Sequence, residues 1–226
     1  MNEAQGIHFG TLSLSGSLLT TWLVMLLLLS FSAFIRHKLQ QEDNLWRTGA
    51  ESLFAMMENA VQEVVPNHYK QVTPFIATLW VYLVCANLLG LIPGLHSPTA
   101  DLSVTAGLAV IVFVSVHWFG IRNLGLKTYL KHYLSPNPIM LPFHLMSEIS
   151  RTLALAIRLF GNIMSLEMAI LLVLLVAGFL VPVPLMMLHL VEALIQAYIF
   201  GVLALLYIGT SLENKTTSSE QGSKNT

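Results

Sequence analysis

One arginine lies in one of the most apolar stretches of the chain. Arg158 is surrounded by Leu, Ala, Ile and Phe, and a carboxylate, Glu167, follows nine residues later. A guanidinium stays protonated in proteins, and placing it at the centre of a membrane helix costs about 3 kcal/mol on insertion scales. A charge retained at this cost predicts a functional role, either binding an anion or controlling the movement of ions.

Helical geometry gathers further polar residues beside this arginine. Residues seven or eleven apart in a helix fall within about 20 degrees of one another. The residues on this stripe, including one about 40 degrees from its centre, are Ser147, Arg151, Arg158, Asn162 and Ser165. Glu148 and Glu167 lie off the stripe, roughly 15 Å before and 13 Å after Arg158 along the helix axis. We therefore expect a carboxylate toward each side of the membrane.

A second polar group follows in the next apolar segment. His189, Glu192 and Gln196 have the spacing i, i+3 and i+7, which places them on one helix face. An antiparallel hairpin turning at residues 181–184 would bring Glu167 level with residues 196–198. Imidazole and carboxylate groups lining such a path can hold water and pass protons.

The elements that carry these residues are predicted to be membrane helices. Of 226 residues, 55% are hydrophobic and 10% are charged, whereas about 25% are charged in soluble domains. Segments of roughly 20 apolar residues can cross the membrane. Five such segments are present, at 18–35, 75–95, 102–121, 142–180 and 184–212. The fourth is longer than a simple crossing needs, which indicates a steep tilt.

The sequence predicts one domain and two flanking segments. Residues 1–17 form an external N-terminus, and residues 18–212 form a single transmembrane helical domain in which 142–212 is a tilted hairpin. Within it, residues 50–65 have apolar residues at helical spacing and acidic residues elsewhere, as expected of an amphipathic helix on the membrane surface. Residues 213–226 form a polar, disordered tail.

Basic residues set the predicted orientation, because short loops rich in Lys and Arg stay cytoplasmic. Nine of them fall on one side of the predicted spans, and none falls in 1–17, 96–101 or 181–183. The N-terminus is therefore expected outside and the C-terminus in the cytoplasm. The start of the chain lacks the basic residues of a removable signal peptide. A net charge of −1 without a basic run argues against nucleic-acid binding, and no motif for a nucleotide or other cofactor is present.

Simpler interpretations compete with these. Arg158 would be structural if it paired with a carboxylate of the bundle, although Glu148 and Glu167 are both more than two helical turns away. Small polar residues such as Asn162 can simply join helices. His189 and Glu192 supply only two ligands, too few to predict a metal site. Glu148 can also be an interfacial residue, together with His144.

Several runs resemble subunit a of F-type ATP synthases. One is Ala156-Ile-Arg-Leu-Phe-Gly-Asn162 with Glu167 five residues after it, and another is His189 followed seven residues later by Gln196-Ala-Tyr-Ile-Phe200. The runs Asn87-Leu-Leu-Gly-Leu-Ile-Pro93 and Pro98-Thr-Ala-Asp101 are similar to further blocks of that family. Together they cover roughly residues 75–212 in the same order. Leu166 and Gly90 depart from the family, which often has Gly and sometimes an acidic residue at these two places.

The resemblance implies a stator subunit of the membrane sector that is no enzyme on its own and needs no cofactor. Arg158 would face the rotating c-ring, and ions would enter and leave through two offset aqueous half-channels. The outer channel and arginine surroundings would include Asn162, Glu167, His189 and Gln196, whereas Glu148 would belong to the cytoplasmic channel. Glu192 is an additional carboxylate of this chain. Implied partners are the c-ring, subunit b of the peripheral stalk, the remainder of the complex and the lipid of a bacterial plasma membrane.

Two other classes of protein remain open at this point. A stand-alone secondary transporter could use an intramembrane arginine to bind an anionic substrate, but the two related halves common in such proteins are not visible. A structural membrane scaffold explains the spans but not the ionisable residues inside them. Both H+ and Na+ remain possible as the ion, because the family's ion-binding carboxylate belongs to subunit c.

Overall fold

The chain is a bundle of long helices preceded by a short hairpin. The computed structural model describes residues 7–9, 12–14, 16–39, 45–91, 97–126, 140–177 and 182–213. The hairpin pairs β1 (Ile7–Phe9) with β2 (Leu12–Leu14). The helices are α1 (Gly16–Leu39), α2 (Leu45–Val64), α3 (Tyr69–Leu89), the 3-10 turn η1 (Pro98–Ala100), α4 (Leu102–Leu124), α6 (Met140–Ala177) and α7 (Pro182–Glu213).

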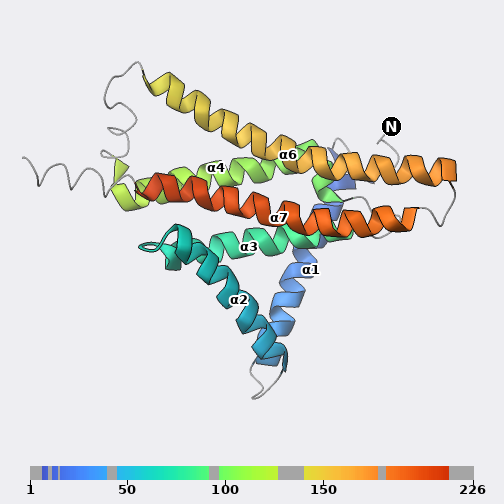
Figure 1. The fold of residues 1–226 in the computed structure, drawn as a ribbon, viewed down its shortest axis with the longest axis horizontal. Helices are drawn as coiled ribbons and strands as arrows, with labels where there is room; N and C mark the ends of the chain where they lie inside the picture. The colour runs from blue at the N-terminus through green and yellow to red at the C-terminus, as the bar shows by residue number, and fades with distance from the viewer. Residues whose placement is uncertain are drawn as a thin grey trace, which may run out of the picture.

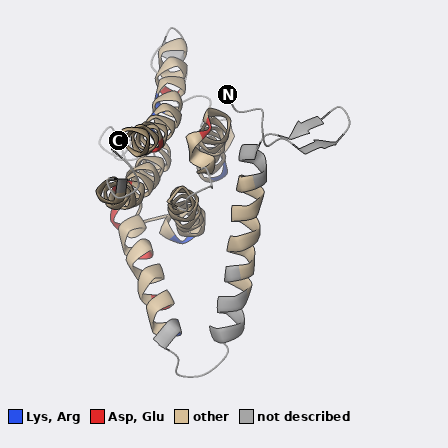
Figure 2. Cartoon of the chain, turned by 90° about the vertical axis from the view of Figure 1, so that its right-hand side faces the viewer, with Lys and Arg blue, Asp and Glu red and all other residues tan. Residues whose placement is uncertain are grey.

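Four helices form the body of the molecule, and two stand away from it. Helices α3, α4 and α7 run side by side, and α6 packs on α4 and α7 but diverges from them toward its own N-terminus (Figure 1). Helices α1 and α2 project from the α3 side as two arms. Figure 2, turned by 90°, looks nearly along α3, α4 and α7, whereas α1 and α2 lie across the line of sight. Helix α1 therefore runs across the direction of the main bundle.

The core is centred on α3 and α7. Side chains that are completely or almost completely buried there include Ile76, Leu83, Phe200, Leu205 and Ile208. Trp80 of α3 stacks on Tyr198 of α7 with 6.1 Å between ring centroids, and its indole N–H donates to the Tyr198 carbonyl at 3.3 Å. The indole passes directly over Gly201, where any side chain would collide with it. This glycine lets α3 and α7 approach closely.

Local signals explain how α4 begins and ends. The Asp101 carboxylate accepts a hydrogen bond from the Ser103 backbone N–H at 2.9 Å, which satisfies one of the free donors at the start of the helix. At the other end, Gly125 adopts a φ of 78°, a conformation that glycine tolerates without steric strain. Its N–H donates to the Ile121 carbonyl. Both ends of this span are therefore specified by single residues.

Four of the five predicted spans are confirmed by length and composition. Among the described residues, apolar stretches long enough to cross a membrane occur at Tyr69–Leu89, Leu102–Asn123, Pro142–Val176 and Val183–Leu212. The first predicted span, 18–35, does lie within a helix, α1, but its described apolar stretch, Thr20–Ser30, is shorter than a crossing. The protein is thus a polytopic all-α membrane protein, as the sequence predicts, apart from the N-terminal hairpin.

The sequence interpretation missed that hairpin. Residues Ile7–Phe9 and Leu12–Leu14 both alternate apolar and polar side chains, which is the period of a strand. The two strands are antiparallel, with Ile7 opposite Leu14 and Phe9 opposite Leu12. The predicted surface helix is also longer than expected at its start, since α2 begins at Leu45 and not at residue 50. The predicted tail beyond residue 213 lies outside the described residues.

Candidate functional site

Arg158 lies on the exposed side of α6. The exposed side of α6 also carries apolar residues, and Leu153, Ile157 and Met164 are between 40% and 56% accessible. Only 17% of the apolar window of α6 is buried within the chain, against 50% for α3, so α6 is an edge helix. Among the described residues, no carboxylate forms an ion pair with Arg158. The structural pairing considered from the sequence is therefore absent from the described part of the chain.

The predicted polar stripe on α6 shares this exposed side. Ser147, Arg151 and Ser165 are exposed like Arg158, whereas Asn162 is half-buried at the edge toward α7. Arg151 lies over the ring of Tyr207 of α7, 5.6 Å from its centroid. The spacing argument thus places the side chains correctly, because α6 continues without interruption from Met140 to Ala177.

A side-chain hydrogen bond fixes the register of α6 against α7. The Asn162 amide Nδ2 donates to Gln196 Oε1 at 2.8 Å. In an antiparallel pair, this places Glu167, five residues further along α6, level with residues 191–192 of α7. The prediction that Glu167 would be level with residues 196–198 is therefore wrong. The turn was assumed at 181–184, but α6 ends at Ala177 and α7 begins at Pro182, so the turn is centred about three residues earlier.

Two of the predicted polar residues on α7 are buried. His189 is 0% exposed and Gln196 is 2% exposed, and Glu192 is half-buried on the same helix. Neither ring nitrogen of His189, nor the amide Nε2 of Gln196, has a hydrogen-bond partner among the described residues. Buried polar atoms almost always find a partner in the protein or in ordered water, so these atoms mark places where water or an ion can bind.

The Glu167 side chain extends from α6 to Ser97, which comes just before η1 and α4. Its Oε1 accepts a hydrogen bond from the Ser97 backbone N–H at 3.0 Å. The hydroxyls of Ser97 and Thr99 lie 2.6 Å apart, and Thr99 Oγ1 donates to Asn87 Oδ1 at 2.8 Å. Asn87 in turn donates from Nδ2 to the Ala193 carbonyl of α7 at 3.1 Å. We call Asn87, Ser97, Thr99 and Glu167 the Glu167 network; it joins α3, η1, α6 and α7.

Gly90 makes room for this network. A Cβ atom at position 90 would lie 2.9 Å from the Ser97 Cβ and 3.3 Å from Glu167 Oε1. The first distance is shorter than side chains tolerate. The backbone at Gly90 is ordinary right-handed helix, with φ −65° and ψ −15°, so glycine is needed here for space and not for conformation. The Glu167 carboxylate occupies space next to Gly90 that a longer side chain would need.

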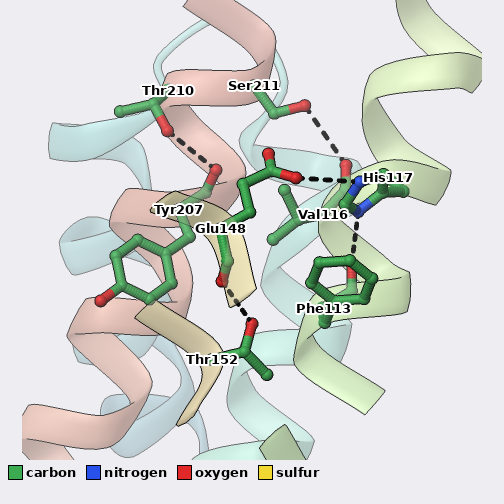
Figure 3. Close-up of polar contacts among 8 residues, drawn as sticks. All are labelled: Phe113, Val116, His117, Glu148, Thr152, Tyr207, Thr210 and Ser211. Carbon is green, nitrogen blue, oxygen red and sulfur yellow. Dashed lines mark hydrogen bonds and ion pairs between the residues drawn. The ribbon is translucent and has the colours of Figure 1, made fainter. Parts of the chain in front are cut away.

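Glu148 belongs to a separate group at the other end of the bundle. Its Oε2 lies 3.1 Å from Nε2 of His117, which belongs to α4. Figure 3 shows this contact between α4 and α6, with Tyr207, Thr210 and Ser211 of α7 nearby. Ser211 Oγ donates to the Val116 carbonyl at 3.2 Å, which ties α7 to α4 beside the pair. Glu148 is therefore more than an isolated interfacial residue.

Sequence reasoning missed the contacts of Ser97 with Glu167 and of His117 with Glu148, and the link from Ser97 through Thr99 to Asn87. Asn87 and Thr99 were noted only as parts of similar runs, and Ser97 and His117 were not singled out. Ser97 and Glu167 are 70 residues apart along the chain, and Asn87 and Ala193 are 106 apart. A histidine within an apolar span was the one local signal that pointed to any of them.

Comparison with known proteins identifies the family. Residues 18–209 match the family model described as ATP synthase A chain. The chain is 52% identical to ATP synthase subunit a of Legionella pneumophila (strain Corby) over 216 residues, which is 93% of this chain and 92% of that one. It is 53% identical to ATP synthase subunit a 2 of Pelobacter propionicus over 207 residues, 92% of this chain and 91% of that one.

The chain belongs to the ATP synthase subunit a family. The resemblance seen in the sequence is thereby confirmed, and the match extends over the first span as well, whereas the similar runs covered only residues 75–212. A more distant relative, ATP synthase subunit a of Nitrosospira multiformis, is 40% identical over 221 residues, 95% of this chain and 88% of that one. The whole transmembrane part therefore has the family's sequence.

The Glu167 network should contribute measurably to stability. Thr99→Val keeps the shape of the side chain but removes the hydroxyl that links Ser97 to Asn87. We expect it to lower the free energy of unfolding by about 1–3 kcal/mol, because buried polar partners are left unsatisfied. The measurement is thermal unfolding of the purified protein in detergent, followed by circular dichroism.

Thr78→Val is the matched control for this substitution. The Thr78 hydroxyl is exposed and donates only to the Pro74 carbonyl of its own helix, at 2.7 Å. We expect the thermal unfolding midpoint of Thr78→Val to stay close to that of the wild type. Equal midpoints for the two variants would show that the network does not stabilise the fold.

Proposed function

We propose that this chain is the stator subunit of a rotary ATP synthase that carries H+ or Na+ to and from the carboxylates of a c-ring. Arg158 prevents direct leakage between two half-channels and couples ion flow to rotation. The observation that carries the proposal is the exposure of Arg158 on an apolar membrane helix, where the described chain provides no counter-charge. An anionic partner from another subunit supplies that charge.

The c-ring fits the surface that surrounds Arg158. Exposed apolar residues cover both helices of the hairpin, which suits contact with the apolar outer helices of a ring as well as with lipid. On α6 they include Leu153, Ile157, Met164, Met168 and Leu172, and on α7 they include Val191, Ile195, Tyr198 and Ile199. A ring carboxylate that passes Arg158 is favoured in its empty, anionic form.

Electrostatics explain how one arginine can block a leak. Two unit charges about 4 Å apart at an effective dielectric constant of about 20 attract or repel by about 4 kcal/mol. At roughly 1.4 kcal/mol per factor of ten, Arg158 favours the empty ring site by nearly a thousandfold. A cation therefore cannot pass directly from one half-channel to the other past Arg158. It must travel around with the ring.

The polar residues on the two sides of Arg158 fit the two half-channels. The Glu167 network, His189, Glu192, Asn162 and Gln196 lie toward the turn between α6 and α7, which the distribution of basic residues places outside. Glu148 lies at the opposite end and belongs to the cytoplasmic channel. The buried nitrogen atoms of His189 and Gln196 without protein partners support a water-filled outer path.

The lengths of α6 and α7 support a strongly inclined hairpin. Their apolar stretches of 35 and 30 residues measure about 52 and 45 Å at 1.5 Å per residue, against a hydrocarbon core of about 30 Å. Tilts of roughly 50–55 degrees from the membrane normal would accommodate them. Helix α1 runs across their direction (Figures 1 and 2), as an upright first span beside an inclined hairpin would.

The remaining partners follow from this assignment. In a bacterial plasma membrane, the N-terminus is outside and the C-terminus is cytoplasmic. Subunit b and the rest of the complex hold the chain against the turning ring. One charge falling through 100 mV yields about 2.3 kcal/mol, so several ions per revolution supply the energy that ATP formation requires elsewhere in the complex.

Removal of the arginine charge tests the coupling role. In membranes that carry Arg158→Gln, we expect ion-driven ATP synthesis to fall by at least about a hundredfold, because the attraction of about 4 kcal/mol is lost. Arg151→Gln is the matched control: it removes an exposed arginine two turns away on the same helix, and should keep most of the activity. Copurification of the c-ring in detergent verifies assembly of both variants. Wild-type synthesis rates in an assembled Arg158→Gln complex would refute the coupling role.

Removal of the outer polar groups tests the outer channel. We expect Glu167→Gln and His189→Ala each to slow ATP-driven ion pumping by roughly tenfold or less, since water and neighbouring polar groups can still carry the ion. The rate in inverted membrane vesicles is the measurement. Glu63→Gln, an exposed carboxylate of α2, is the control and should pump like the wild type. If neither outer variant changes the rate or its pH profile, the outer channel lies elsewhere.

A further inference from the structure

A pair of ionisable side chains lies where α4, α6 and α7 meet. Nε2 of His117 is 3.1 Å from Oε2 of Glu148, and the two side chains are 27% and 21% exposed. Glu148 Oε2, the oxygen at the contact, is buried, and water can reach the pair only through other atoms of the two side chains, which are partly exposed. The family resemblance gave a channel role to Glu148 but none to His117, and the proposed cytoplasmic path has so far used α6 alone.

The backbone of α4 fixes which nitrogen of His117 faces Glu148. Nδ1 lies 2.9 Å from the Phe113 carbonyl oxygen (Figure 3). A carbonyl oxygen only accepts hydrogen bonds, so Nδ1 must carry the hydrogen. In the neutral ring, the lone pair is then on Nε2, the atom that faces the carboxylate. The Phe113 ring, 4.3 Å from the imidazole centroid, holds the imidazole in this orientation.

Several polar and charged groups of the described helices lie near the pair. On α7 the nearby polar side chains are Tyr207, Thr210 and Ser211, of which only Tyr207 can titrate (Figure 3). On α6, the Arg151 guanidinium carbon lies over the Tyr207 ring, 5.6 Å from its centroid, and the exposed His144 lies one turn before Glu148. On α4, Arg122 is exposed near the end of the helix. His117 is thus an ionisable group in direct contact with the Glu148 carboxylate.

We propose that His117 and Glu148 are a proton-exchange pair in the cytoplasmic half-channel, and that Nε2 of His117 takes and returns the proton of Glu148. The O–H bond of the protonated carboxyl breaks as the N–H bond on Nε2 forms, which leaves a carboxylate beside an imidazolium. The reverse transfer restores the carboxylic acid. With one proton the pair has no net charge, and it becomes −1 when the proton leaves to water. This inference rests on the proposed function and extends the cytoplasmic path from α6 to α4.

The test is ATP-driven proton pumping in inverted membrane vesicles, because the buffer outside them sets the pH of the cytoplasmic face. His117→Gln retains a hydrogen-bond donor toward Glu148 but cannot titrate. We expect its initial pumping rate to fall on the order of tenfold in alkaline buffer, where protons are scarce, and much less in acidic buffer. His68→Gln, at the junction of α2 and α3, is the matched control and should show the wild-type profile.

The double variant distinguishes an exchange pair from two independent residues. We expect His117→Gln combined with Glu148→Gln to pump no more slowly than the slower single variant, since the two side chains act as one unit. ATP hydrolysis by detergent-extracted complexes verifies assembly, and His117→Asn serves as a second variant if His117→Gln assembles poorly.

Three results would overturn the pair and leave the stator role intact. The first is a wild-type pH profile of pumping in His117→Gln while Glu148→Gln pumps slowly. The second is that each single variant lowers the pumping rate by the same factor at every pH and that the two factors multiply in the double variant. The third is that wild-type vesicles pump Na+ instead of H+. Failure of the stator role itself has a different signature, which is continued ATP synthesis without Arg158.

Discussion

The structure depends on a guanidinium that cannot be neutralised and that lies on the exposed side of an apolar membrane helix. Arg158 forms no ion pair with a carboxylate of the described chain, and apolar residues such as Ile157 and Met164 are exposed on the same side of α6. Such a charge is stable in a membrane only when another molecule brings an anion to it. Most features of the chain follow from this condition: α6 is an edge helix with little of its own surface buried, and the polar groups lie along the bundle on either side of Arg158.

The two polar groups differ in construction, in keeping with two separate half-channels. Toward the turn between α6 and α7, the hydrogen bonds of the Glu167 network link α3, η1, α6 and α7, and nearby nitrogen atoms of His189 and Gln196 are buried without partners among the described residues. At the other end, Glu148 has a direct ionisable partner and remains partly accessible. Glu148 and Glu167 are 19 residues apart on one helix, about 28 Å along its axis, so no direct polar contact joins them.

Periodicity and composition predicted what local sequence can determine. The helical class, four of the spans, the polar stripe on α6 and the shared face of His189 and Gln196 all follow from residue spacing. The α7 residues that lie opposite Glu167 could not be predicted from spacing. In an antiparallel pair, moving the centre of the turn by three residues changes the residue opposite Glu167 by about six positions. The partners of Glu167 and Glu148 were also out of reach, since Ser97 and His117 come from other helices or turns. Gly90 illustrates the same limit: its departure from the family was visible in the sequence, but only the structure shows that the Glu167 carboxylate uses the space.

The position of Arg158 relative to the c-ring can be seen in a density map of the complete detergent-extracted complex. We expect the Arg158 guanidinium to point at the ring of c subunits, within about 6 Å of the carboxylate that passes it. A guanidinium that faces lipid or detergent, with no other subunit over that part of α6, would show that Arg158 does not act on the ring.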